Sequence, residues 1–258
     1  MINMASVEFS EEEIEAASDV FRSGMVREGE KTEEFEDKFC QKYGCDRAVA
    51  VSSGTAALHL TYLALSREYP DKSEVITTPF SFIATSNTIL LADLEPVYVD
   101  INPRTFNLDV GQVEDKITDG TLAIAPTHLF GLPYDYGSLR SIADRHDLFI
   151  VNDAAHAIHA EYDGQSAAGL DDFNCFSFYA TKNLAVGEGG MVSGDHELLE
   201  TMRLIKRQGQ SAKYTFTEIG MNYRPTDVFS EIGKLRLDKI DRWTEIRRRN
   251  AKLLTDGL

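Results

Sequence analysis

The sequence lacks any apolar run approaching the roughly 20 residues that a membrane-spanning helix needs. Its start, MINMASVEFSEEEIEAA, contains neither the basic segment nor the apolar segment of a secretion signal. Cysteine is scarce, and the three present (Cys40, Cys45 and Cys175) are odd in number and lack metal-binding spacing. These absences predict a cytoplasmic protein with reduced thiols and no membrane contact.

Positive charge is also in short supply. The 258 residues include 26 Lys and Arg against 42 Asp and Glu, a formal net charge of −16. A general nucleic-acid-binding protein needs a basic face, so this balance argues against one. Basic residues gather at 234–252, where a solvated helix face is the ordinary interpretation and a phosphate-binding patch is the alternative.

What the chain does contain is a regular alternation of short apolar runs and amphipathic stretches. Hydrophobic residues make up 43% of it, enough for a sizeable core. The predicted strands are 48–51, 74–78, 95–100, 121–127 and 148–153, and the predicted helices are 10–21, 31–43, 55–67, 82–92 and 135–146. The alternation predicts an α/β fold with a mostly parallel central sheet and helices on both faces.

Residues just after each predicted strand are the candidates for a site, because ligands bind beyond the carboxyl ends of parallel strands. The segment SSGTAAL, 52–58, follows one strand and opens a helix. Its hydroxyl and N–H groups at the positive helix end suit a phosphate, and ordinary helix capping is the alternative. Phe82 follows the next strand, either as a core residue or as a ring that stacks on a planar ligand.

Asp153 ends a buried apolar run in VNDAAHAIHA, 151–160. A buried aspartate needs a cation, a backbone cap or the protonated nitrogen of a cofactor as its partner. Asp153, His156 and His159 also allow the hypothesis of a metal hydrolase, although their spacing matches no standard zinc pattern.

Lys182 stands between an aromatic run and a glycine turn in FSFYATKNLAVGEGGM, 176–191. A long cation is costly to bury unless it is paired or chemically used. Pairing with Glu188 is the ordinary interpretation. The alternative is the nucleophile of Schiff-base chemistry, a lysine whose pKa desolvation holds near neutrality.

Together these pieces suit one cofactor, pyridoxal 5′-phosphate (PLP). PLP needs a lysine, an acid that faces its ring nitrogen, a flat stacking partner and a phosphate cradle. Lys182, Asp153, Phe82 and the segment 53–56 supply these four features in the expected places. The sequence therefore predicts a PLP site and no metal site.

The ordered motifs resemble the PLP-dependent sugar aminotransferases of the DegT/DnrJ/StrS type, which have the aspartate-aminotransferase fold type I. The matching segments include AVAVSSGTAALHL, TPFSFIATSNTI, THLFGLP, VNDAAHAIHA, FSFYATKNLAVGEGGMV and IGMNYRPTDVFSEIGKLRLDKID. The resemblance implies a PLP-binding large domain over 1–225, including the N-terminal helices. It implies a long helix over 226–258, leading to a small C-terminal domain that this chain lacks.

The resemblance also implies a role for each site residue. Lys182 is the Schiff-base lysine that also moves the proton, Asp153 faces the ring nitrogen, and His156 lies near the 3′-oxygen. Phe82 stacks on the ring. The remaining cofactor-binding positions, around the phosphate, are Ser53, Gly54, Thr55, Ala56 and Ser177, with Asn222 reaching the phosphate of the neighbouring subunit in a homodimer.

The implied reaction moves an amino group from an amino acid, glutamate or glutamine, to a keto group of a nucleotide-linked sugar. Lysine at position 182 favours amino transfer, because dehydratase relatives carry histidine there. Asn152 and His159 depart from the family's usual glutamate and glycine. Two further hypotheses stand beside this one: a truncated, non-catalytic PLP-binding partner subunit, and the metal hydrolase.

Overall fold

We describe the fold from a computed structural model, which describes residues 6–258. The helices are α1 Glu11–Ser23, α2 Glu30–Tyr43, α3 Gly54–Glu68, α4 Ile83–Leu91, α5 Tyr136–His146, α6 Leu198–Ile205, α7 Asp227–Leu237 and α8 Ile240–Gly257. The strands are β1 Arg47–Val51, β2 Glu74–Thr77, β3 Glu95–Tyr98, β4 Thr121–Ala125, β5 Phe149–Asp153, β6 Glu161–Tyr162, β7 Gln165–Ser166, β8 Phe173–Ser177, β9 Gly190–Gly194, β10 Gln210–Ala212 and β11 Thr215–Phe216.

Seven strands form the central sheet, in the order β1-β9-β8-β5-β4-β2-β3. Parallel pairing links β3, β2, β4, β5 and β8 in succession. β9 runs antiparallel between β1 and β8. The predicted mostly parallel sheet is thereby confirmed, with one reversed strand that the sequence patterns do not indicate.

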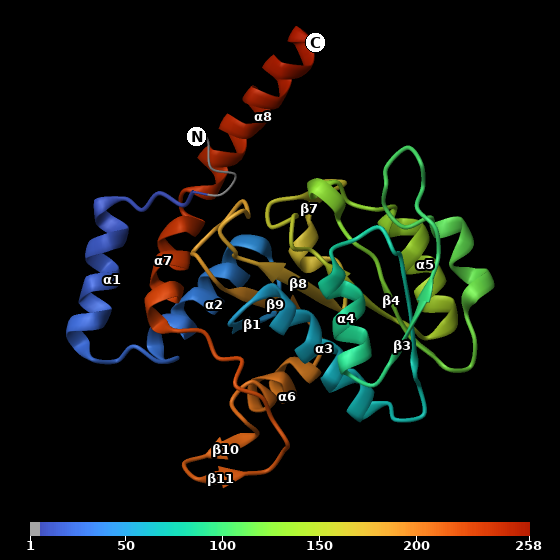
Figure 1. Cartoon of the computed structure of the whole chain (residues 1–258), viewed down its shortest axis with the longest axis horizontal. Coiled ribbons are helices and arrows are strands. Elements are labelled where there is room, and N and C mark those ends of the chain that lie inside the picture. Colours follow the sequence, from blue (N-terminus) through green and yellow to red (C-terminus); the bar gives the residue numbers. More distant parts are fainter. Residues whose placement is uncertain (1–5) are drawn as a thin grey trace.

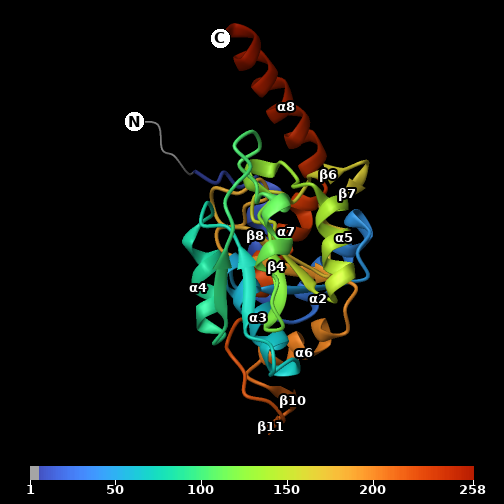
Figure 2. The ribbon, with the colours of Figure 1, turned by 90° about the vertical axis from the view of Figure 1, so that its right-hand side faces the viewer.

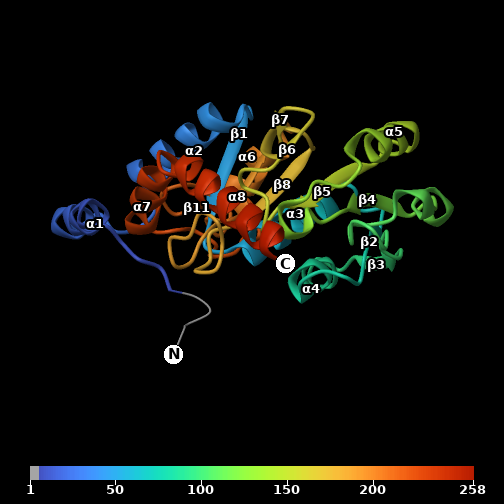
Figure 3. The same ribbon diagram turned by 90° about the horizontal axis from the view of Figure 1, so that it is seen from above.

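Helices cover both faces of this sheet. α3, α4 and α6 lie on one face, while α2, α5 and α7 lie on the other (Figures 2 and 3). The side chains of β1 pack against helices on both faces, because successive side chains of a strand point in opposite directions. Val49 and Val51 pack toward α3, whereas Ala48 and Ala50 pack toward α2.

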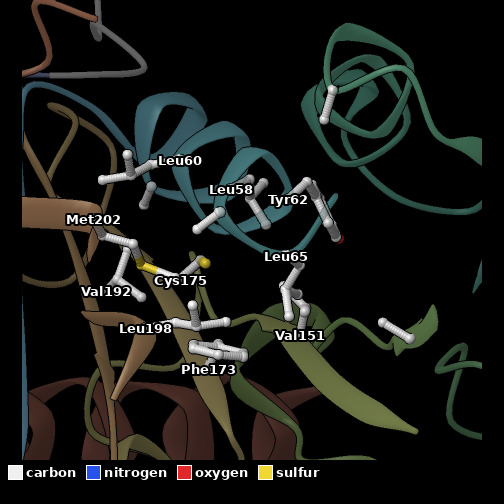
Figure 4. Packing of buried hydrophobic residues seen from close by; sticks show 14 of the residues in the cluster. Leu58, Leu60, Tyr62, Leu65, Val151, Phe173, Cys175, Val192, Leu198 and Met202 are labelled. Atoms are coloured by element: carbon white, nitrogen blue, oxygen red, sulfur yellow. The ribbon is translucent and has the colours of Figure 1, made fainter. Parts of the chain in front are cut away.

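The core beneath α3 is built from large side chains of that helix and the strands under it. Leu58, Tyr62 and Leu65 of α3 face Val151 and Cys175 of the sheet (Figure 4). Tyr62 and Leu65 are fully buried. Burying each such side chain contributes about 1.5–3 kcal/mol, so this layer anchors the helix whose first turn borders the cavity described below.

The predicted helices and strands are present, with their ends shifted by a few residues. α1 begins with a capping box: Glu13 N–H donates to Ser10 Oγ, and Ser10 N–H donates to Glu13 Oε2. The strand expected over 121–127 ends at Ala125, because Pro126 has no N–H to donate to the ladder. The three cysteines are free thiols.

The stretch 226–258, expected to be one long helix, is two helices, α7 and α8. The break coincides with Lys239, whose ammonium group lies 3.0 Å from Glu12 and 3.1 Å from Glu13 of α1. Beyond it α8 extends away from the sheet (Figure 1). Within residues 6–258, none of the helices combines the length and apolarity needed to cross a bilayer.

The basic stretch 234–252 fits the solvated-face interpretation in its second half and departs from it in its first half. Arg236 is buried and forms an ion pair with Glu13 at 2.9 Å. Lys234 lies 2.5 Å from Glu34 of α2. These two cations hold α7 against the N-terminal helices, whereas the basic residues of α8 at positions 242, 247, 248, 249 and 252 are exposed.

Candidate active site

A cavity of about 400 Å³ opens at the carboxyl edge of the sheet. Residues at or just past the ends of five strands line it, those of β1, β2, β4, β5 and β8. The predicted site residues on this wall are Ser53, Gly54, Thr55, Phe82, Asp153, His156, Ser177 and Lys182. The fold therefore brings together eight residues from several well-separated segments of the chain.

The first turn of α3 forms one wall of the cavity. Ser53 caps the helix, and its Oγ accepts a hydrogen bond of 3.0 Å from Ala56 N–H. Ala56 is buried and does not line the cavity, so the N–H groups of Gly54 and Thr55 are the ones left beside it. No acidic residue lies in this first turn, which leaves the positive helix end to attract an anion.

Gly54 is required where this turn meets β8. A Cβ added at Gly54 would lie 2.7 Å from Cβ of Ser177. Glycine therefore allows the hydroxyl of Ser177 to lie beside the first turn of α3. The two segments together form a small polar cradle at the helix end.

Asp153 lies at the end of β5 and is 4% exposed. Its Oδ2 accepts a hydrogen bond of 2.6 Å from Thr85 Oγ1, and its Oδ1 accepts one of 3.2 Å from Ala155 N–H. The backbone-cap interpretation is thus correct for one oxygen. Within residues 6–258 no lysine, arginine or histidine forms an ion pair with this carboxylate.

Lys182 lines the same cavity and is half-buried. Burial lowers the pKa of its amine from the ordinary value of 10.5, and the negative charge of Asp153 opposes that shift. The pairing with Glu188 is absent from the part of the chain that the structure describes, although Glu188 also borders the cavity. At a given pH, a larger fraction of the Lys182 amine is therefore uncharged than of the amine of a solvated lysine.

Two rings flank the cavity. Phe82 is the N-cap residue of α4 and is 74% exposed, so the interpretation of this ring as core is wrong. His156 stacks on Phe130, with ring centroids 6.0 Å apart and planes 8° from parallel. Burial and the charge of Lys182 lower the pKa of His156, and the backbone N–H of Phe130 donates to its Nδ1 at 3.4 Å. A neutral imidazole fits both observations.

Three hydroxyl groups beside Asp153 escaped the sequence analysis. Thr127 Oγ1 donates to Ser81 Oγ at 3.2 Å, and Ser81 Oγ lies 2.7 Å from Thr85 Oγ1. Thr85 in turn contacts Asp153. Ser81 and Thr85 are four residues apart at the start of a helix. This spacing is the one feature of the sequence that indicates that they lie on the same face.

Asn222 and His159 lie away from this cavity. Asn222 is exposed, and its Oδ1 accepts a hydrogen bond of 3.0 Å from Arg224 Nε. His159 Nε2 lies 3.3 Å from Asp241 of α8, so it cannot complete a metal site with Asp153 and His156. A search of residues 6–258 finds no group of three or more His, Cys, Asp or Glu side chains arranged to hold a metal ion.

With this geometry in place, comparison with known proteins identifies the family. The model of the DegT/DnrJ/EryC1/StrS aminotransferase family matches residues 7–258. The chain belongs to this family. Members of the family are PLP-dependent enzymes, and this agrees with the cofactor that the motifs predict.

Named relatives within the family act on sugars. GDP-perosamine synthase of Caulobacter vibrioides is 39% identical over 219 residues, which are 84% of this chain and 58% of that protein. The solved structure of Helicobacter pylori PseC, an aminotransferase involved in the biosynthesis of pseudoaminic acid, matches with a TM-score of 0.88 and 30% identity. That match covers 93% of this chain and 66% of PseC.

A further solved structure, S. venezuelae DesV in complex with a ketimine intermediate, matches with a TM-score of 0.89 and 35% identity. It covers 96% of this chain and 67% of DesV. Across four curated relatives, the chain spans 51% to 67% of the relative's length. The likeness thus extends over nearly all of this chain and about two thirds or less of most relatives.

The residues present fit PLP. The cradle of Gly54 and Ser177 suits a phosphate, because an added Cβ would fill it. Asp153 is a buried carboxylate that lacks a cation within residues 6–258, as a partner of a protonated ring nitrogen would. Lys182 and the exposed ring of Phe82 border the same space.

Proposed function

We propose that this protein is a PLP-dependent aminotransferase that moves an amino group from glutamate or glutamine to a keto group of a nucleotide-linked sugar. One observation carries the proposal: Lys182, half-buried and without an ion pair in residues 6–258, shares a cavity with the carboxylate of Asp153, which forms no ion pair there either. The sugar class is supported by GDP-perosamine synthase and PseC among the relatives. We place the PLP-binding unit in residues 1–225.

Lys182 and Asp153 divide the proton chemistry in this proposal. Lys182 is the Schiff-base lysine, and its lowered pKa lets the released amine accept a proton from the amino donor. Asp153 holds a proton on the ring nitrogen by accepting its hydrogen bond. PLP, when bound, supplies an electron sink for the charge left on the donor carbon.

The other cavity residues bind and orient. Gly54 and Thr55 donate their free N–H groups to the phosphate, and Ser177 adds a hydroxyl. Phe82 covers one face of the ring. Neutral His156 lies beside Lys182 and donates a hydrogen bond toward the 3′-oxygen.

We further propose a homodimer with shared active sites. Exposed aromatic rings lie at and near the cavity: Phe82, which lines it, is 74% exposed, and Phe130, which stacks on the lining residue His156, is 77% exposed. Asn222 is exposed on a separate part of the surface. A second copy covering the rings would bury apolar area and bring its Asn222 to the phosphate of the first.

The test is the visible absorption spectrum of the chain mixed with PLP, for wild type, Lys182→Ala and the control Lys252→Ala. Lys252 is an exposed lysine that pairs with Asp256 at 2.9 Å. We expect a Schiff-base band in wild type and Lys252→Ala and none in Lys182→Ala. Borohydride reduction followed by peptide mass mapping should place the adduct on Lys182. A band that persists in Lys182→Ala would refute the assignment.

The alternative of a PLP-binding partner subunit without turnover differs in one result. If it holds, the Schiff-base band forms but adding glutamate or glutamine leaves it unchanged. An aminotransferase instead would convert bound PLP to its amine form in the first half-reaction with one of these donors, with loss of that band. The spectra after addition of each donor therefore separate the two functions.

A further inference from the structure

We propose that Thr85 is a positioning residue that orients the carboxylate of Asp153 toward PLP. The inference rests on the proposed function, because it concerns the acid that would face the ring nitrogen. Thr85 ends a chain of hydroxyl groups that begins at Thr127 and passes through Ser81. The three links measure 3.2 Å, 2.7 Å and 2.6 Å, and the last joins Thr85 Oγ1 to Asp153 Oδ2.

The hydrogen bonds in this chain of hydroxyl groups all point in one direction, toward Asp153. An ionised carboxylate can only accept, so the hydroxyl of Thr85 must donate to Asp153. That donation uses the single proton of Thr85, and Ser81 must therefore donate to Thr85. Thr127 then donates to Ser81. Hydroxyl groups aligned in one direction polarise one another, so each link strengthens the donor that reaches the carboxylate.

The two ends of the hydroxyl chain are buried, and Ser81 between them is half-buried and lines the cavity. Thr85 is fully buried, Asp153 is 4% exposed and Thr127 is 6% exposed. The other oxygen of Asp153 accepts from Ala155 N–H, so both oxygens have a fixed donor. The carboxylate plane is therefore set by two different segments, α4 and the turn after β5. Its remaining lone pairs are left for the cavity that Asp153 lines.

The same turn of α4 positions the stacking ring. Phe82 is the N-cap residue of α4, and Thr85 N–H donates to Phe82 C=O at 3.1 Å. Asp153 and Phe82, which would hold PLP from two directions, are thus linked: Asp153 bonds Thr85, and Thr85 lies three residues after Phe82 in the same helix turn. Thr85 itself does not line the cavity, so its effect on PLP must pass through Asp153.

Loss of the Thr85 donor should be visible in bound PLP. A protonated ring nitrogen draws electron density from the group that links PLP to Lys182 and so keeps the pKa of that group low. When Asp153 is misaligned, the ring proton is held less well. The pH at which the visible band changes should then rise.

The experiment compares Thr85→Val, Thr85→Ser and Thr88→Val, each loaded with PLP. Thr88 is a matched control: it is fully buried in the same helix, but its hydroxyl bonds only backbone carbonyls, those of Ala84 at 2.8 Å and Thr85 at 3.2 Å, and not Asp153. We expect Thr85→Val to raise the dissociation constant of PLP about tenfold, the effect of one hydrogen bond to a charged group. Its band midpoint should move to higher pH. Thr85→Ser and Thr88→Val should match wild type in both readouts.

Three results would overturn the inference. The first is a folded Thr85→Val with wild-type affinity and midpoint. The second is an equal shift in Thr88→Val, which would show a packing effect. If Thr85→Val does not fold, Ser81→Ala tests the preceding link, and a wild-type midpoint there is the third. By contrast, wild type that forms no Lys182-dependent band refutes the proposed function itself, so the two failures are distinguishable.

Discussion

Two lysines lie in the interior of this protein under opposite conditions. Lys206, at the end of α6, is fully buried and lies 2.6 Å from Glu28 and 3.2 Å from Glu36. Its ammonium also donates to Ala50 C=O at 2.8 Å. Lys182 is only half-buried, yet it forms no ion pair with any residue that the structure describes.

This difference distinguishes a structural lysine, Lys206, from the lysine that we propose to be reactive, Lys182. Lys206 is surrounded by acceptors that require its charge, and Arg203 and Arg207 complete the cluster around Glu36 and Glu28. Lys182 is in a cavity where burial disfavours the charge. Depth of burial alone would rank Lys206 as the more unusual residue, whereas the lack of an ion-pair partner supports the proposal that Lys182 is the reactive lysine.

The largest expected contrast is in labelling of the PLP-free chain by an amine-reactive reagent. We expect Lys182 to react ahead of exposed Lys252, because its lowered pKa supplies more neutral amine. Lys206 should remain unmodified in the folded protein, since it is inaccessible and charged. Peptide mass mapping over time measures all three. Labelling of Lys206 at the rate of Lys182 would remove the contrast.

The next effect is on stability. Lys206→Met leaves Glu28 and Glu36 buried with one cation each, and we expect the free energy of unfolding to fall by about 3–5 kcal/mol. Lys182→Met removes a charge that has no partner in residues 6–258 and should change it by less than about 1 kcal/mol. Urea unfolding followed by circular dichroism measures both. Equal losses would contradict the comparison.

The smallest expected effect is the pH dependence of stability that the buried acid Asp171 causes. Asp171 accepts from Tyr134 and Asn152, and burial raises the pKa of its carboxyl to about 7. The folded state therefore holds this proton to higher pH than the unfolded chain does, and the stability it confers is lost as pH rises through about 7. We expect the free energy of unfolding to fall by about 1 kcal/mol between about pH 6 and about pH 8.

Asp171→Asn is the control for that pH dependence. The amide cannot lose a proton in this range, so the part of the slope due to position 171 should vanish. Paired urea curves of wild type and variant at both pH values measure it. An unchanged slope in Asp171→Asn would assign the titration to another group.

The fold was largely predictable because its signals are local. A helix period or a short apolar run identifies most elements, and Gly24 and Gly44 end α1 and α2 in the left-handed conformation expected of glycine. The reversed strand β9 was not predictable in this way. Its sequence, GMVSG, carries two glycines and no long apolar run, and its direction is set by partners that are distant in the chain.

The cavity residues that could be predicted from the sequence are those that directly follow strands. Asp153 and Phe82 follow apolar runs, so the topology of a parallel sheet brings them together. The position of Thr85 depends on side-chain direction within a helix turn, which the sequence only suggests through Ser81 four residues before. The partners of Lys206 are more remote still: Glu28 and Glu36 lie in or just before α2, and no sequence spacing relates them to α6.

The pairing of β1 with β9 has a consequence for biosynthesis. Val51 is opposite Gly190, so the strand that leads into Ser53 has its ladder partner far later in the chain. At ribosomal speeds that interval is on the order of ten seconds. During that time the nascent chain can form α3 and the inner parallel strands, but the cradle beside Gly54 has no second wall until β8 and β9 emerge. The proposed cofactor site can therefore be completed only late in translation.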